Sequence, residues 1–163
     1  MNRMPLLVSE ERAREDHGRC MEDKMKRQGR LSHEVRMTVP FHDVDPMQIV
    51  WHGNYLKYFD IARFGLFNKA GIDLWEFYER TGYLFPITKT TTKHILPLRY
   101  RDEFCCIATI VEARIKIVID FEIRLVGRDE IFTKGRGDQV AVKYPEMEMM
   151  LEIPKQIQEA LGG

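Results

Sequence analysis

Residues 41 to 55 of the sequence, FHDVDPMQIVWHGNY, hold the densest group of side chains that could do chemistry. The carboxylate of Asp45 is the main candidate among them. Because an aspartate in water has a pKa of about 3.9, Asp45 would be ionised at neutral pH and could act directly as a nucleophile. The alternative role of general base works best with a pKa nearer to the working pH, so burial would have to raise the pKa of this carboxyl. The sequence leaves both roles open.

Two neighbours influence what Asp45 can do. Pro46 disfavours helical backbone at the residue before it, so Asp45 should end an extended segment and present its carboxylate to the helix that follows. Asp43 stands two residues earlier and, in extended backbone, would share a face with Asp45. We expect Asp43 to support the loop or to tune the pKa of Asp45 rather than to react itself.

A helix should begin directly after this loop. Asn54 is a favourable N-cap, and the first N–H groups of a helix lack partners within the helix. These groups, together with the partial positive charge of the helix start, could stabilise an oxyanion, and the backbone amide of His52 is the main candidate donor. We expect Trp51 to form pocket wall or core. Gly53 would let the backbone approach a ligand closely.

The flanking patterns predict the elements that must position these residues. The stretch HEVRMTVPF (33–41) alternates as a half-buried strand does, and the apolar positions after Asn54 predict about 16 helical residues that end at Gly71. A short helix is expected near 72–82, strands near 84–95, 103–115, 116–126 and 130–144, and a last helix that begins with Pro154. The apolar face of 116–126 should lie against the long helix. This order predicts an α+β fold in which a curved antiparallel sheet wraps around a long central helix, with free edges that favour pairing of two chains.

The run VDPMQIVWHGNYLKYFDIARFGLF resembles the hallmark of the hotdog-fold acyl-CoA thioesterases of the 4-hydroxybenzoyl-CoA thioesterase type, which include the short-chain acyl-CoA thioesterases associated with the Tol-Pal system. The matching positions are Asp45, Pro46, Ile49, Val50, Trp51, His52, Gly53, Asn54 and Tyr55. The resemblance, which extends in element order from about 33 to 160, implies a hotdog fold, a homodimer or homotetramer, and hydrolysis of a short-chain or aromatic acyl-CoA to free acid and coenzyme A without a cofactor.

The resemblance also implies roles for individual residues. Asp45 would be the nucleophile or general base, and His52, through its backbone amide with or without its side chain, would form the oxyanion site with Gly53 and Asn54. Trp51 and Tyr55 would contact the substrate. Asp60 and Arg63 match an acid and an arginine of the family's helix, although by themselves they would form an ordinary surface ion pair.

Coenzyme A carries phosphates, so cationic side chains should gather near the pocket mouth. The candidates are Lys89, Lys93, Arg99 and Arg101, with Arg114 and Lys116 after the following strand. Each is also an ordinary surface residue type. His94 raises the question of a metal site with Asp45 and His52, but their spacing matches no metal motif and the resembling family uses none, so we expect no metal. The KGRGD stretch (134–138) is expected to be a glycine-kinked strand.

The totals fit one cytoplasmic domain. The chain has 163 residues, 44% of them hydrophobic, and 25 basic residues balance 25 acidic ones, so no general field for nucleic acid or membrane is expected. Its three cysteines suggest no disulfide framework, and no apolar run is long enough for a membrane span. Residues 1–31 are predicted to be a charged extension before a hotdog domain at 32–163. Two other functions stay open: a non-catalytic hotdog protein that binds or assembles with a partner through this extension, and a thioesterase acting on acyl carrier protein.

Overall fold

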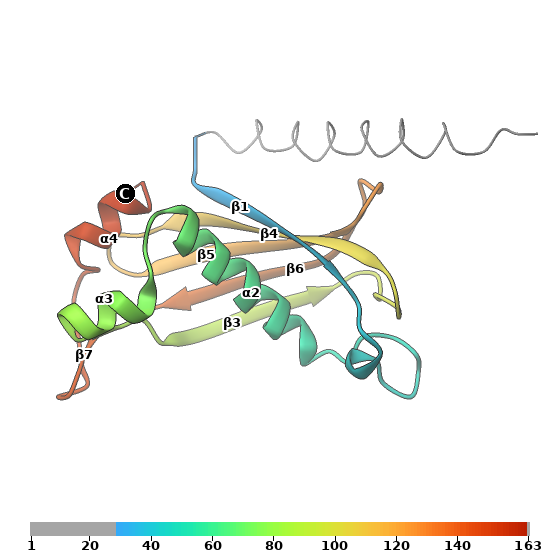
Figure 1. Cartoon of the computed structure of the whole chain (residues 1–163), viewed down its shortest axis with the longest axis horizontal. Helices are drawn as coiled ribbons and strands as arrows, with labels where there is room; N and C mark the ends of the chain where they lie inside the picture. The colour runs from blue at the N-terminus through green and yellow to red at the C-terminus, as the bar shows by residue number, and fades with distance from the viewer. Residues whose placement is uncertain (1–28, 163) are drawn as a thin grey trace, which may run out of the picture.

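The computed structural model describes residues 29–162, in which an antiparallel sheet wraps around one long helix (Figure 1). The main sheet has the order β1 (Ser32–Thr38), β4 (Glu103–Glu112), β5 (Ile117–Leu125), β6 (Ile131–Gln139), β3 (Ile87–His94). A small second sheet joins β2 (Tyr83–Leu84), β7 (Val142–Lys143) and β8 (Glu148–Met149). The helices are the 3-10 turn η1 (Phe41–Asp43), α2 (Asn54–Lys69), α3 (Leu74–Thr81) and α4 (Lys155–Ala160). This arrangement confirms the predicted α+β hotdog architecture. No helix in residues 29–162 is long and apolar enough to cross a membrane.

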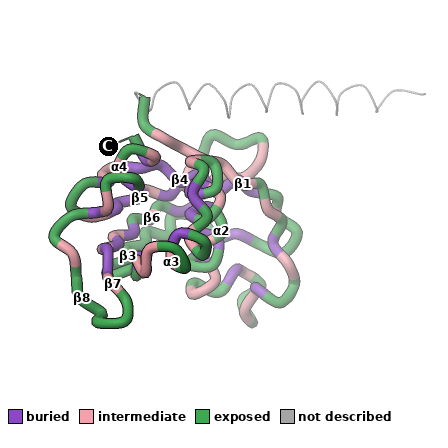
Figure 2. The backbone as a smooth tube through the Cα atoms, turned by 60° about the vertical axis from the view of Figure 1, so that its left-hand side comes forward, coloured by how far each residue is buried: buried purple, intermediate pink, exposed green. Residues whose placement is uncertain are grey.

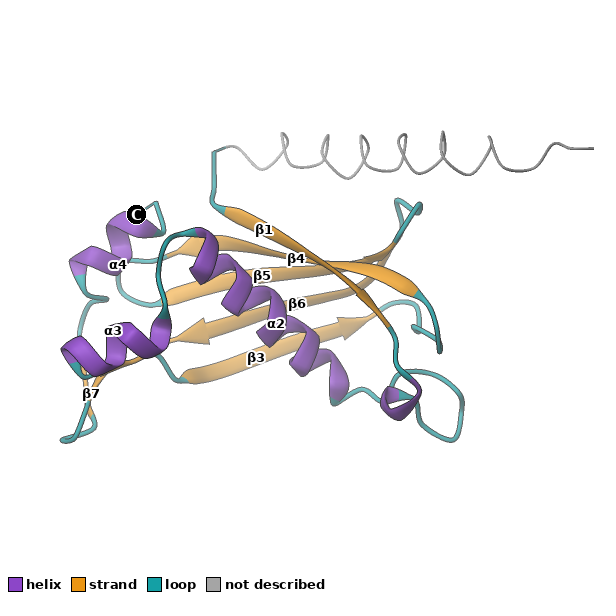
Figure 3. Ribbon diagram, in the orientation of Figure 1, coloured by secondary structure: helices purple, strands orange, loops and turns teal. Residues whose placement is uncertain are grey.

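The central helix α2 crosses the concave face of the sheet diagonally (Figure 3). It has 16 residues, as predicted, and it ends shortly before Gly71, whose φ of 75° lies in the left-handed region that favours glycine. Its buried face consists of Tyr55, Tyr58, Phe59, Ala62, Arg63, Leu66 and Phe67. The ring of Phe59 stacks on Phe121 of β5, with 4.7 Å between centroids. The apolar face of the 116–126 segment therefore lies against the long helix, as the alternation predicted.

Two glycines of β6 make room for this helix. Gly135 and Gly137 pair with Phe121 and Ile119 of β5, so they lie on the face that α2 covers. A Cβ atom at Gly135 would be 2.4 Å from Cε2 of Phe59, which is far inside van der Waals contact. The strand keeps its register through both glycines, and its irregularity falls near residue 132 instead. The strand therefore has no bulge at the glycines, and Gly135 serves close packing against the helix; the predicted kink stays a prediction.

The two edges of the main sheet differ. β1 is partly buried, whereas all eight residues of β3 are exposed (Figure 2). Cross-strand partners share a face, so His94, which pairs with Thr133, lies on the helix side together with Ile123. Lys93 pairs with Lys134 and lies on the opposite, outer face. The open edge and the alternation of β3 thus separate its side chains into two different environments.

The element boundaries depart from the predictions in three places. The strand predicted at 84–95 is divided into β2 and β3 around Pro86, which cannot donate a ladder hydrogen bond. The one predicted at 130–144 is divided into β6 and β7. Pro154 stands one residue before α4 rather than inside it. The predicted charged extension at 1–31 lies almost wholly outside the described residues.

Candidate active site

The loop between β1 and α2 folds back on itself as a small hairpin. Val44 and Val50 form an antiparallel bridge, and the Asp45 N–H donates to the carbonyl of Ile49 at 2.9 Å. The turn closes when the Gln48 N–H donates to the carbonyl of Asp45 at 2.8 Å, with Gln48 in the left-handed region at φ 61°. Ile49 also bridges to Arg99, in the segment that follows β3. The hairpin is therefore fixed at both its tip and its base.

Asp45 stands at the tip of this hairpin and is partly exposed. Its Oδ1 atom accepts a hydrogen bond from the Met47 N–H at 2.8 Å, which is an Asx turn. Within residues 29–162 its second oxygen accepts no hydrogen bond. One oxygen thus orients the carboxylate, and the other is left available to a substrate or a water molecule.

Asp43, by contrast, is a buried residue with 1% of its surface exposed. Its carboxylate accepts hydrogen bonds from Tyr58 Oη at 2.6 Å and from Lys57 Nζ at 2.5 Å. Burial alone would raise the pKa of Asp43, but the hydrogen bonds from Lys57 and Tyr58 outweigh it and hold the pKa below its ordinary value. The expectation that Asp43 and Asp45 share a face is wrong, because the 3-10 turn η1 directs Asp43 inward.

The backbone of Asp43 also ties the loop to the helix start. Its carbonyl oxygen accepts from the Trp51 N–H at 2.9 Å and from Nδ2 of Asn54 at 3.0 Å. Asn54 is therefore not the N-cap that the sequence predicted. It is the first residue of α2, and its N–H donates to the carbonyl of Trp51 at 2.9 Å, because the chain already turns helically at Gly53.

This early start leaves two free amides at the positive end of α2. Within the described residues the N–H groups of His52 and Gly53 make no hydrogen bond. They lie at the end of a 16-residue helix, where the unpaired N–H groups concentrate partial positive charge. An oxygen that gains negative charge would be stabilised at this position.

The indole of Trp51 lies directly over the Cα atom of Gly53. A Cβ atom at Gly53 would be 2.1 Å from Cζ3 of Trp51. The indole is 51% exposed, and its ring centroid is 5.0 Å from that of His52. Gly53 was expected to admit a ligand; in the structure the glycine first of all admits Trp51. The partly exposed indole forms one wall beside the free amides.

Tyr55, expected in contact with substrate, is a core residue with 3% of its surface exposed. Its hydroxyl accepts a hydrogen bond from the Leu98 N–H at 3.2 Å. Its ring packs edge-on against His94, with 4.6 Å between centroids. Burial, and then the neighbouring His52, lower the pKa of His94. From the sequence, His94 was weighed only as a possible metal ligand, whereas the structure brings it to the start of α2.

No group of three or more potential metal ligands (His, Cys, Asp or Glu) in residues 29–162 could hold a metal ion.

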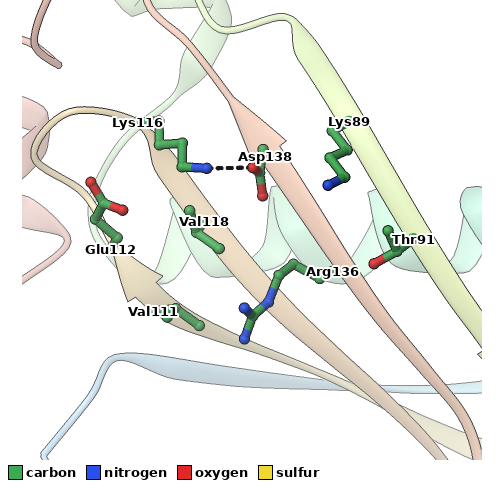
Figure 4. A pocket seen from close by; sticks show the side chains of 8 residues that line it. All are labelled: Lys89, Thr91, Val111, Glu112, Lys116, Val118, Arg136 and Asp138. Atoms are coloured by element: carbon green, nitrogen blue, oxygen red, sulfur yellow. Dashed lines mark hydrogen bonds and ion pairs between the residues drawn. The ribbon is translucent and has the colours of Figure 1, made fainter.

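The cationic candidates for coenzyme A do not gather in one place. Lys89 lies on the outer face of the sheet, in a shallow pocket with Lys116 and Asp138 whose charged atoms are 2.5 Å apart (Figure 4). Lys93 lies on the same outer face. Arg99 and Arg101 instead follow β3, where Arg99 bridges to the hairpin that carries Asp45. The predicted cluster is thus divided, because Lys89 and Lys93 belong to β3 and point to its outer face, whereas Arg99 and Arg101 lie in the segment after the strand.

Three other charged candidates are paired. Arg114 lies 3.6 Å from Glu152 on the surface. Arg63 was predicted to form a surface pair with Asp60, but its side chain is only 11% exposed. It donates to Asp60 at 2.9 Å and to the buried Oε1 of Gln139 at 2.8 Å. This contact links α2 to β6, so Arg63 is a structural residue of the core rather than a surface one.

Comparison with known proteins shows the family of this chain. The family described as the thioesterase-like superfamily matches residues 39–161. A 1,4-dihydroxy-2-naphthoyl-CoA hydrolase of Thermosynechococcus vestitus is 26% identical over 125 residues, which cover 74% of this chain and 77% of that protein. Both matches extend over more than a hundred residues, so they do not depend on the loop at residues 41–55 alone.

Solved structures share the fold. A mutant 4-hydroxybenzoyl CoA thioesterase complexed with 4-hydroxybenzoyl CoA has a TM-score of 0.74 at 21% identity, covering 80% of this chain and 99% of that one. A 1,4-dihydroxy-2-naphthoyl-CoA thioesterase from Synechocystis has a TM-score of 0.72 at 16% identity, covering 80% and 96%. The family match includes the hairpin, α2 and the whole sheet except β1, and the chain therefore belongs to the thioesterase-like superfamily and has the hotdog fold of acyl-CoA thioesterases.

Proposed function

We propose that this protein hydrolyses the thioester of a hydroxylated aromatic acyl-CoA, releasing the aromatic acid and coenzyme A. The observation that carries the proposal is the pair of free amides at His52 and Gly53, next along the chain to the hairpin that holds the carboxylate of Asp45. The substrate class comes from the similar proteins, whose names specify 1,4-dihydroxy-2-naphthoyl and 4-hydroxybenzoyl thioesters.

The chemistry assigns one role to each group. The amides of His52 and Gly53 hold the thioester carbonyl oxygen, which becomes an oxyanion as the carbonyl carbon is attacked. The partial exposure of Asp45 and its unbonded second oxygen support direct attack, because a carboxylate oxygen that no hydrogen bond occupies can reach the carbonyl carbon. Attack forms an acyl-aspartyl anhydride and breaks the C–S bond, the thiolate takes a proton from solvent, and water then hydrolyses the anhydride to regenerate Asp45.

The positions of the cations suggest where coenzyme A lies. Arg99 and Arg101 lie in the segment after β3, where Arg99 bridges to the hairpin. We propose that these two side chains bind the phosphates of coenzyme A. Lys89 and Lys93 are on the outer face and are not part of this assignment.

We also propose that two copies pair through β3. The strand is an edge of the main sheet, all eight of its residues are exposed, and it contains no proline that would block pairing. The side of α2 that the sheet does not cover exposes Leu56, Ile61 and Phe64, which a second copy could bury.

The proposal predicts a specific pattern of thiol release. Hydrolysis would be followed with 4-hydroxybenzoyl-CoA, 2-hydroxybenzoyl-CoA, benzoyl-CoA and butyryl-CoA. We expect turnover of the hydroxylated aromatic esters and, for Asp45→Asn, a decrease in kcat of at least about 100-fold. Asp129→Asn, in the exposed β5–β6 turn, is the matched control and should keep full activity.

Two outcomes would contradict the function: no turnover of any ester, or full activity in Asp45→Asn. A single turnover in ¹⁸O-labelled water separates the two roles of Asp45. Label in the aspartate shows direct attack followed by water opening the anhydride at the aspartyl carbonyl. Label only in the released acid requires rapid-quench mass spectrometry as well, in which an acyl group on Asp45 shows direct attack and its absence supports base catalysis.

A further inference from the structure

His94 is not part of the loop that carries the proposed chemistry, but the fold brings its ring to the first turn of α2, directly after that loop. It is the last residue of β3, which ends at the end of the sheet where α2 begins (Figure 1). Its imidazole is exposed and packs against Tyr55, in the first turn of α2, with 4.6 Å between ring centroids. His52, three residues before Tyr55, also lowers the pKa of His94, because two positively charged rings would repel each other.

The orientation of this imidazole is determined by the fold. The register of β3 with β6 pairs His94 with the buried Thr133, so the ring points to the helix side of the sheet. The ring of Tyr55 packs edge-on against the imidazole. The Tyr55 hydroxyl in turn accepts a hydrogen bond from the Leu98 N–H, which fixes the position of Tyr55. The imidazole is therefore held against Tyr55, three residues after His52 in the chain, while His94 as a whole remains exposed on the helix side of the sheet.

A neutral imidazole offers one donor and one acceptor, whereas the backbone amides of His52 and Gly53 can only donate. Burial and the nearby His52 lower the pKa of His94, so its ring is uncharged at neutral pH. A phenolic hydroxyl also both donates and accepts. The imidazole of His94 therefore matches a phenol better than it matches a carbonyl oxygen.

The position of the hydroxyl follows from the geometry of the acyl group. A hydroxyl ortho to the thioester carbonyl lies within hydrogen-bond distance of the carbonyl oxygen, about 2.7 Å. If the amides of His52 and Gly53 hold that oxygen, the ortho hydroxyl lies next to the imidazole side chains around them. A para hydroxyl would lie on the far side of the ring.

We infer that His94 is a specificity-determining residue that hydrogen-bonds a hydroxyl ortho to the thioester carbonyl, so that the enzyme prefers ortho-hydroxylated aroyl-CoA substrates. This inference rests on the proposed thioesterase function and narrows its substrate class. Tyr55 acts through His94 and is a positioning residue.

The test compares kcat/KM for 2-hydroxybenzoyl-CoA, 4-hydroxybenzoyl-CoA and benzoyl-CoA in the full-length parent protein, His94→Leu, His94→Gln and Thr91→Ala. The parent should prefer the ortho-hydroxy ester over benzoyl-CoA. His94→Leu should reduce that ratio about tenfold, the effect of one hydrogen bond, with little change for benzoyl-CoA. His94→Gln, which keeps a donor and an acceptor, should retain part of the ratio. Thr91→Ala, on the outer face of the same strand, should not change it.

The ratio is the decisive readout, because a merely structural role of His94 would lower all three rates together. A parent without ortho preference, or a ratio that survives in His94→Leu, overturns the inference while the thioesterase function stands. A parent that hydrolyses none of the esters refutes the proposed function and the inference with it. His94→Ala gives the same test should the leucine variant fail to fold.

Discussion

At the scale of single residues, two aspartates in one loop are given different environments. Asp43 is buried and accepts hydrogen bonds from Lys57 and Tyr58, whereas Asp45 is partly exposed and uses one oxygen in its own turn. The pKa of Tyr58 is raised, first by burial and then by Asp43, so the tyrosine stays protonated as the donor. Asp43 holds the loop to α2, which leaves Asp45 as the acid available for the proposed reaction.

Acid should therefore destabilise the protein partly through Asp43. Its folded pKa lies below the ordinary value of 3.8, so its stabilising effect is complete above that value and is lost as the pH falls through the folded pKa. We expect Asp43→Asn to lower the free energy of unfolding by about 2 kcal/mol at pH 7, a typical effect for charged hydrogen bonds. The difference between parent and variant should shrink as the pH decreases from about 5 to 2.

Urea unfolding of the parent and of Asp43→Asn across this pH range measures the difference directly. Asp129→Asn removes an exposed carboxylate and serves as the control. A difference between the parent and Asp43→Asn that does not change with pH would show that Asp43 does not act through its charge.

At the scale of elements, the position of α2 depends on the two glycines beneath it. Gly135 faces Phe59 so closely that any side chain there would collide with the ring, whereas a Cβ at Gly137 would be at an ordinary 3.6 Å from Phe121. Neither glycine has a positive φ, so the two sites differ in space and not in backbone strain. Since α2 carries the free amides at its start, displacement of Phe59 would disturb the site.

Paired alanine substitutions test this reading. Gly135→Ala should lower the free energy of unfolding by about 1–3 kcal/mol through overpacking and should also lower kcat. Gly137→Ala should be neutral or stabilising by a few tenths of a kcal/mol, because it reduces the entropy of the unfolded chain. Chemical unfolding and the thiol-release assay provide the two measurements, and equal stability losses in the two variants would refute the role of Phe59 contact.

At the scale of the whole molecule, β3 is an edge strand of the main sheet, and a second copy of the chain could pair with it. All eight residues of β3 are exposed, and no further strand within residues 29–162 pairs with this edge. In a pair joined through these edges the two sheets become continuous, and the second copy lies beside His94.

Light scattering after size exclusion tests the pairing. We expect the parent to have the mass of a dimer or a multiple of it, and Thr90→Glu with Thr92→Glu to weaken association more than tenfold, because like charges then oppose each other at the shared edge. Arg128→Glu changes the net charge equally in the exposed β5–β6 turn and should leave the mass unchanged. A monomeric parent, or an unchanged mass in the double variant, would contradict pairing through β3.

The sequence by itself determined the features that depend on local patterns. Side-chain period gives the alternation of residues 116–126 and the helix that ends near Gly71, and Pro46 keeps Asp45 out of a helix. These effects act over a few residues. Periodicity gave the α+β layout, and the hotdog fold was predicted from the resemblance of the loop motif to a known family. Local pattern misjudged Asn54 as the cap, since a one-residue shift of a helix start depends on the Trp51 and Asp43 carbonyls.

Only the tertiary structure decided which side chains meet. His94 reaches the start of α2 because the register of β3 with β6 directs its ring to the helix side, and the same alternation sends Lys89 and Lys93 outward. Arg63 is buried because Gln139 lies beneath it, 76 positions away in the sequence. Such contacts depend on strand register and helix placement, which are set by the packing of distant segments and leave no periodic trace in the sequence.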